Sequence, residues 1–135
     1  MKQSILCFFF MALAAGLSAQ SDQAEVRQAT DAAVSTYQLD EEQAEEMYAI
    51  QERRFRNLAS IEALRQADYN LFLQKKNSIR EGTMASIRRL LREDQMEAFK
   101  EQLISRRQKE AALAQQLKTE GATREEIQLA IWQLE

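Results

Sequence analysis

The chain has 135 residues, of which 18 are basic and 21 are acidic, and it contains no histidine, no proline and one cysteine. An acidic balance argues against nucleic acid as the main partner, because a phosphate-binding surface normally carries a basic excess. Without histidine or a glycine-rich phosphate loop, the sequence also argues against an enzyme and against a transition-metal site. We expect no cofactor.

Residues 1–19 are predicted to be a cleaved secretory signal peptide. Lys2 gives a positive start, residues 5–17 are almost entirely apolar, and Leu17-Ser18-Ala19 fits a cleavage site. The apolar run is too short for a membrane span. The only cysteine, Cys7, lies inside it, and no Asn-x-Ser/Thr glycosylation signal occurs in the sequence. Small secreted eukaryotic domains usually depend on disulfides, so export to a bacterial periplasm is favoured over outright secretion.

Residues 20–135 are predicted to form one all-α domain, with no stable membrane anchor. Alanine, glutamate, glutamine, arginine and leucine dominate this range, and no segment alternates with the period of a strand. A capping box of Asp22 with Glu25 predicts the start of a first helix, and Asp40 with Gln43 predicts the start of a second.

The second half of the chain carries three further signals. Asp68 or Asn70 marks the turn between the second and third helices. Gly82-Thr83 either kinks the third helix or is tolerated within it. Gly121 is placed to end a helix, and Thr123, with a glutamate three residues on, predicts the start of a short last helix.

The charges favour a hairpin of the second and third helices. An acidic block and a basic stretch face each other if the chain reverses near residue 68, and many weak exposed pairs would then favour one register. The acidic block contains Asp40, Glu41, Glu42, Glu45 and Glu46, and the basic stretch contains Lys75, Lys76, Arg80, Arg88, Arg89 and Arg92.

Two short phrases repeat at a distance of 52 residues. Leu39-Asp40-Glu41-Glu42-Gln43 corresponds to Leu91-Arg92-Glu93-Asp94-Gln95, and Arg54 corresponds to Arg106. Asp40 is a residue type that caps helices, whereas the side chain of Arg92 has no atom that accepts a backbone hydrogen bond. We therefore expect the helices on either side of Arg92 to be joined differently, and the sequence leaves open whether they are separate or almost continuous.

These phrases resemble the two Leu-Thr-x-x-Gln motifs of the Spy/CpxP-like periplasmic proteins, over about residues 39–107. The resemblance implies a thin, cradle-shaped antiparallel homodimer that works without ATP and holds unfolded or damaged envelope proteins. It places clients on a concave face with basic and apolar patches. Some relatives instead restrain a stress-sensing kinase, and others bind metals. The motif residues with a structural role would be Leu39, Asp40, Gln43, Leu91 and Gln95.

Two functions therefore stay open: a chaperone for many unfolded chains, or a dedicated regulator that binds one partner, such as a sensor kinase domain or an anti-sigma factor, in an envelope stress or metal response. In either case the expected binding residues are basic. They are Arg53, Arg54, Arg56, Lys75, Lys76, Arg80, Arg88, Arg89, Arg106 and Arg107.

Apolar residues support the dimer. We expect that a hairpin of two long helices leaves part of its apolar side chains for a partner subunit to cover. The set comprises Met47, Ile50, Phe55, Leu58, Ile61, Phe72, Ile79, Ile87, Leu90, Phe99 and Leu103.

Other apolar residues have two interpretations. Met47, Met84 and Met96 are either core residues or adaptable client contacts. The last helix, with Trp132, is too short to be stable alone, so it docks on the bundle or on the partner, or acts as a lid over the client groove.

Arg54 and Arg106 lie within apolar seams. Each arginine is either paired inside the protein, Arg106 with Glu110, or projects from an open surface toward clients.

Overall fold

The computed structural model describes residues 11–134, in which it contains six α-helices, one 3-10 turn and no β-strand. The all-α prediction is confirmed. The predicted signal peptide falls partly outside the described residues, and Cys7 lies there. None of the described helices combines the length and the hydropathy that a membrane span requires. The helices are α1 (Met11–Tyr37), α2 (Glu41–Ile61), α3 (Leu64–Ala67), α4 (Tyr69–Leu90), α5 (Met96–Thr119) and α6 (Arg124–Gln133).

Local polar residues set several helix ends. Asp40 Oδ1 accepts from the backbone N of Gln43 at 2.9 Å, and Gln43 Oε1 accepts from the backbone N of Asp40 at 3.3 Å, which completes the predicted capping box of α2. Thr123 caps α6 in the same way. Asp68 caps α4. Gly121 has a φ of 86°, a left-handed conformation that glycine adopts without strain, and it follows the end of α5 as predicted.

The structure also tests the helix start predicted at Asp22 and the two alternatives at Gly82. The start predicted at Asp22 is wrong, because α1 is already helical from Met11 and passes through residue 22. Gly82 is tolerated inside α4 without interrupting it, and a Cβ atom added there would meet nothing within 4 Å.

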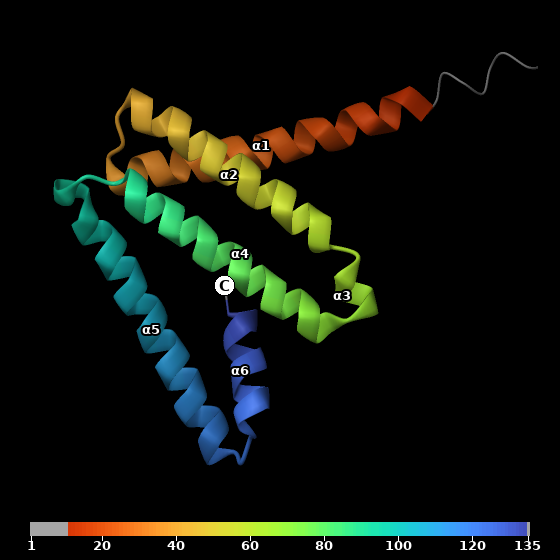
Figure 1. The fold of residues 1–135 in the computed structure, drawn as a ribbon, viewed down its shortest axis with the longest axis vertical. Helices are drawn as coiled ribbons and strands as arrows, with labels where there is room; N and C mark the ends of the chain where they lie inside the picture. Colours follow the sequence, from red (N-terminus) through yellow and green to blue (C-terminus); the bar gives the residue numbers. More distant parts are fainter. Residues whose placement is uncertain (1–10, 135) are drawn as a thin grey trace, which may run out of the picture.

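α2 crosses α1 and packs against both α1 and α4, and α6 returns from the far end of α5 to α4 (Figure 1). α2 and α4 run in opposite directions, because Gln43 in the first turn of α2 contacts Leu90 at the end of α4. α3 makes the reversal between them. α4 thus contacts both α2 and α6.

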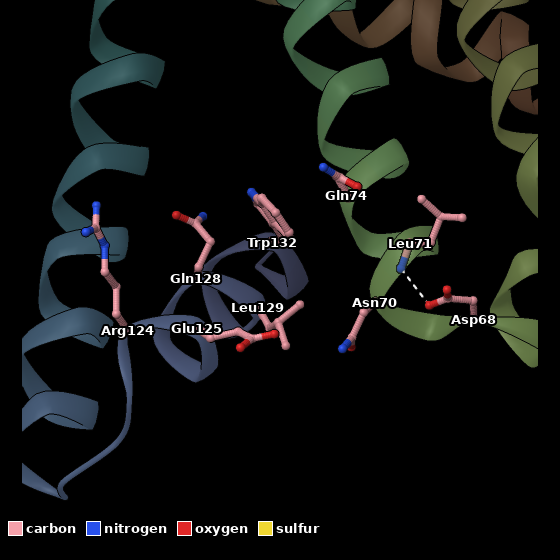
Figure 2. A pocket seen from close by; sticks show the side chains of 9 residues that line it. All are labelled: Asp68, Asn70, Leu71, Gln74, Arg124, Glu125, Gln128, Leu129 and Trp132. Atoms are coloured by element: carbon pink, nitrogen blue, oxygen red, sulfur yellow. Dashed lines mark hydrogen bonds between the residues drawn. The ribbon is translucent and has the colours of Figure 1, made fainter.

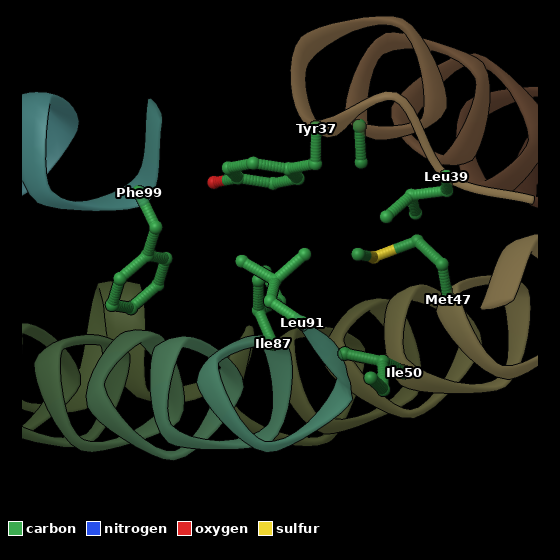
Figure 3. Close-up of a cluster of buried hydrophobic side chains, with 8 residues drawn as sticks. Tyr37, Leu39, Met47, Ile50, Ile87, Leu91 and Phe99 are labelled. Carbon is green, nitrogen blue, oxygen red and sulfur yellow. The ribbon is translucent and has the colours of Figure 1, made fainter. Parts of the chain in front are cut away.

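The main apolar cluster joins α1, α2, α4 and α5 (Figure 3). Met47 is fully buried at its centre, and Phe99 from α5 lies against Tyr37 from α1, with ring centroids 6.4 Å apart. Complete burial of a side chain of this size stabilises the fold by about 1.5–3 kcal/mol. The buried members are Ala33, Tyr37, Leu39, Met47, Ile50, Ile87, Leu91 and Phe99.

A second cluster forms where α6 meets α4. Ile61, Phe72 and Leu73 are buried there, and Leu129 and Trp132 of α6 pack against them. The last helix therefore docks on the helices of its own chain. This contact supplies the tertiary support that a ten-residue helix needs.

The apolar argument for a dimer is wrong in its premise. Every side chain of the set that we expected a partner to cover is buried or partly buried within one chain. Among the described residues, the exposed large apolar side chains are Tyr69 and Ile104, and neither belongs to that set. The premise fails because α1, α5 and α6 also cover the pair formed by α2 and α4. The homodimer stays a prediction that rests on the resemblance.

Candidate functional site

The two repeated phrases meet through their glutamines. Gln43 Nε2 donates to Gln95 Oε1 at 2.8 Å, and Gln95 Nε2 donates to Gln43 Oε1 at 2.9 Å. Both side chains are buried. We call this reciprocal pair, together with its backbone partners, the glutamine bridge.

The backbone partners of the bridge follow the same spacing of 52 residues. The second donor of Gln43 reaches the carbonyl oxygen of Leu90 at 3.0 Å, and that of Gln95 reaches the carbonyl oxygen of Gln38 at 3.1 Å. The two side-chain oxygens also accept from the backbone N of Asp40 and Arg92. Because a glutamine amide has two donors and two acceptor lone pairs, both side chains use their full capacity.

Arg92 takes a different role from the one expected. Its side chain cannot cap, but Arg92 Nη1 lies 2.6 Å from Asp40 Oδ2, the corresponding residue of the first phrase. The two helices are separate: Leu91 and Arg92 are extended, and a 3-10 turn (Glu93–Gln95) precedes α5. The contacts of Arg92 with Asp40 and of Gln95 with Gln43 hold the chain at this break.

The repeat continues into the core. Leu39 and Leu91 are both buried in the main cluster, and so are Met47 and Phe99, which follow each leucine by eight residues. The pairs α1–α2 and α4–α5 are therefore held together at equivalent points. These contacts fix the position of α4 relative to its neighbouring helices, and with it the surfaces along α4.

Three of the predicted basic residues line one groove between α2 and α4, which we call the arginine groove. Arg53 Nη2 and Arg89 Nη2 donate to the same oxygen, Ser86 Oγ, at 3.0 and 3.2 Å. Arg54 Nη1 lies 3.4 Å from Gln51 Oε1. The groove has a volume of about 370 Å³ and no acidic residue lines it; its lining is Arg53, Arg54, Asn57, Ser78, Ile79, Gly82, Thr83, Ser86 and Arg89.

Arg106 is paired within the protein. Its Nε donates to Glu110 Oε1 at 2.7 Å, and both of its terminal nitrogens lie 3.4 Å from the carbonyl oxygen of Leu134. Arg80 lies nearby and is partly buried; burial first, and then the charge of Arg106, lower its pKa. Arg54 and Arg106 thus have different surroundings despite their equivalent places in the repeat.

The remaining predicted residues lie apart from the arginine groove. Arg56 lines a groove between α1 and α2 whose lining includes Glu25, Glu52 and Glu62. Lys75, Arg88 and Arg107 are exposed, and Lys76 is partly buried. The ten basic residues therefore do not form one patch.

The acidic block and the basic stretch meet at the ion pair of Asp40 with Arg92. The backbone N–H of Gln43 and then Arg92 lower the pKa of Asp40. Glu41, Glu42, Glu45 and Glu46, by contrast, are exposed.

A larger groove between α4 and α6 was not predicted (Figure 2). It has a volume of about 640 Å³ and combines apolar side chains with amides. The amphipathic pattern of the last helix was the one available signal. We call it the α4–α6 groove; its lining is Asp68, Asn70, Leu71, Gln74, Arg124, Glu125, Gln128, Leu129 and Trp132.

One side of α4 contributes residues to both grooves. Residues from both linings recur along it at intervals of three or four, the spacing that places side chains on one face of a helix. We call this the α4 stripe; it consists of Leu71, Gln74, Ser78, Gly82, Ser86 and Arg89.

Among residues 11–134, no group of three or more aspartate, glutamate, histidine or cysteine side chains is arranged to hold a metal ion. Comparisons of the chain with protein-family models, with curated proteins and with solved structures found no match. The resemblance to the Spy/CpxP-like proteins stays a prediction.

Proposed function

We propose that this protein is an exported, ATP-independent chaperone of the bacterial periplasm that holds unfolded or damaged proteins. The observation that carries the proposal is the α4 stripe, whose residues line both the acid-free arginine groove and the α4–α6 groove. Unfolded chains expose apolar and charged side chains together, and the two grooves offer a partner for each kind.

The stripe has the length of a short extended segment. Leu71 and Arg89 are separated by roughly 27 Å at a rise of 1.5 Å per helical residue. An extended polypeptide covers that distance with about eight residues. A segment with apolar residues near Trp132 and an acidic residue near Arg89 would match the stripe in length and in chemistry.

Polar side chains in the α4–α6 groove suit binding without sequence specificity. Asn70, Gln74 and Gln128 each carry a donor and an acceptor, so they can pair with either kind of backbone group of a client. Leu129 and Trp132 supply apolar surface beside them. No bound nucleotide is needed for contacts of this kind.

The proposal is tested by aggregation of several unrelated denatured substrates, followed by light scattering. The protein is expected to slow aggregation of all of them at near-stoichiometric amounts. Replacing Arg54 and Arg89 with Gln is expected to weaken protection, because both line the arginine groove. Replacing Arg56 and Arg107 with Gln removes the same charge elsewhere and is expected to leave protection intact.

Two outcomes would contradict the proposal. Equal loss in both double variants would mean that net charge, and not the arginine groove, carries the effect. Protection of no substrate, combined with tight binding to one envelope protein, would favour the dedicated regulator instead.

A further inference from the structure

Two guanidinium groups converge in the arginine groove without a counter-charge. The terminal nitrogens of Arg53 and Arg89 lie 3.0 and 3.2 Å from Ser86 Oγ, so two positive groups approach one neutral oxygen. Like charges held this close repel each other. A neutral hydroxyl offsets this repulsion less well than an anion, because only the anion brings an opposite charge that attracts both guanidinium groups.

Carboxylates satisfy other arginines of the protein but not these. Arg65, Arg92 and Arg106 each form an ion pair at 2.6 or 2.7 Å. In the described part of the chain, the guanidinium groups that line the arginine groove have no carboxylate partner.

The hydroxyl groups of the groove are already used as donors. Ser78, Thr83 and Ser86 donate to the carbonyl oxygens of Gln74, Ile79 and Gly82 within α4. The guanidinium groups and the amide of Asn57 are therefore the donors that remain for a ligand, and the positive charge of the arginines favours an anionic acceptor.

We propose that the arginine groove binds a phosphate-type oxyanion. Phosphate offers several acceptor oxygens to the planar donor forks of Arg53, Arg54 and Arg89, a geometry that arginine matches better than lysine does. Space for the anion exists beside Gly82, where an added Cβ meets nothing within 4 Å. The volume of about 370 Å³ lies in the range of small-molecule sites and exceeds one phosphate, so the anion is either free or the terminal group of a larger ligand such as a lipid headgroup. This binding does not depend on the proposed chaperone function.

The test is calorimetric titration of the full mature chain with inorganic phosphate and with pyrophosphate at low ionic strength, where screening is weak. Gly82→Asp places a carboxylate in the groove, and Gly82→Asn has nearly the same shape without the charge. Wild type and Gly82→Asn are expected to give saturable binding at sub-millimolar phosphate. Gly82→Asp is expected to weaken it at least about tenfold, because its carboxylate takes the arginine donors.

A second variant covers the case in which Gly82→Asp does not fold, as checked by circular dichroism. Arg53→Gln combined with Arg89→Gln is expected to lose the binding, while Arg56→Gln combined with Arg107→Gln is expected to keep it. Co-sedimentation with vesicles of phosphatidic acid, compared with vesicles of phosphatidylcholine, identifies the source of the phosphate group. Co-sedimentation that Gly82→Asp abolishes indicates the phosphate of a lipid headgroup. Saturable binding of inorganic phosphate without co-sedimentation indicates free phosphate. Absence of saturable binding to both inorganic anions, or equal binding by wild type and Gly82→Asp, would overturn the proposal.

Discussion

Replacing either glutamine of the bridge should lower the free energy of unfolding. The loss in each single variant should be more than half of the loss in the double variant. Gln95→Met keeps the side-chain shape but removes four hydrogen bonds: two to Gln43, one to Gln38 and one from the backbone of Arg92. At about 1 kcal/mol of net stabilisation per bond, and with an apolar side chain left in a buried place, the free energy of unfolding should fall by about 2–4 kcal/mol.

The double variant separates the bridge from simple loss of contacts. In either single variant, the amide of the remaining glutamine is buried and has lost the donor and the acceptor of its partner. The double variant, Gln43→Met with Gln95→Met, removes both amides. We therefore expect the double variant to cost less than the sum of the two single variants, by about 1–2 kcal/mol. For a domain of this size each single variant should lower the melting temperature by about 8–15 °C.

Urea unfolding followed by far-ultraviolet circular dichroism measures these differences. Gln108 on α5 is exposed, so Gln108→Met is the matched control and should change the free energy of unfolding by less than about 0.5 kcal/mol. Single variants that match this control, or a double variant whose cost equals the sum of the two, would refute the reasoning about the bridge.

Three other predictions concern stability. The backbone N–H of Gln43 and then Arg92 lower the pKa of Asp40. The charge of Asp40 should therefore stabilise the fold above the unfolded pKa of about 4. This stabilisation should be lost as the pH falls through the lower pKa of the folded state. Urea titrations between neutral and acidic pH should show the loss in wild type and not in Asp40→Asn; identical pH profiles would contradict it. Gly82→Ala should raise the free energy of unfolding by up to about 1 kcal/mol, because the position is helical and a Cβ meets no neighbour; a fall in the melting temperature would show that the space is occupied. Arg106→Gln should lower the free energy of unfolding by about 1–2 kcal/mol, since it breaks the pair with Glu110 and the contact to the end of α6; a change below about 0.5 kcal/mol, as is usual for surface positions, would mean that the arginine acts only at the surface.

Helix ends were predictable where their signals are local. The caps at Asp40 and Thr123 and the glycine at position 121 need only residues three or fewer positions away. The same kind of signal failed at Asp22, because an aspartate followed three residues later by a glutamate can also occur within a continuing helix.

The break at Arg92 was not predictable from its neighbours in the sequence. Arginine removes the local reason for a helix start, so the sequence left open whether the helices on either side are separate or continuous. In the structure they are separate, and the contacts of Arg92 with Asp40 and of Gln95 with Gln43, each across 52 residues, hold the break. The repeat itself was visible, but the direct contact between its two copies was not.

The sequence predicted which residue type forms the candidate site, but not which arginines lie together in the structure. Arginines were expected to bind clients, and the pair of Arg106 with Glu110 was among the alternatives because the two residues are one helical turn apart. The convergence of Arg53 and Arg89 on Ser86 joins two helices, and its register depends on how α2 packs against α4. The α4–α6 groove likewise depends on the return of α6, which also removed the apolar argument for a dimer.

Nuclear magnetic resonance titration of the isotope-labelled protein with an unfolded client tests the central claim most directly. The account predicts that the amide signals that shift lie along α4 from Leu71 to Arg89 and at the facing residues Arg53 and Leu129. Shifts confined to surfaces away from α4, or no shifts at client concentrations that suppress aggregation, would contradict it.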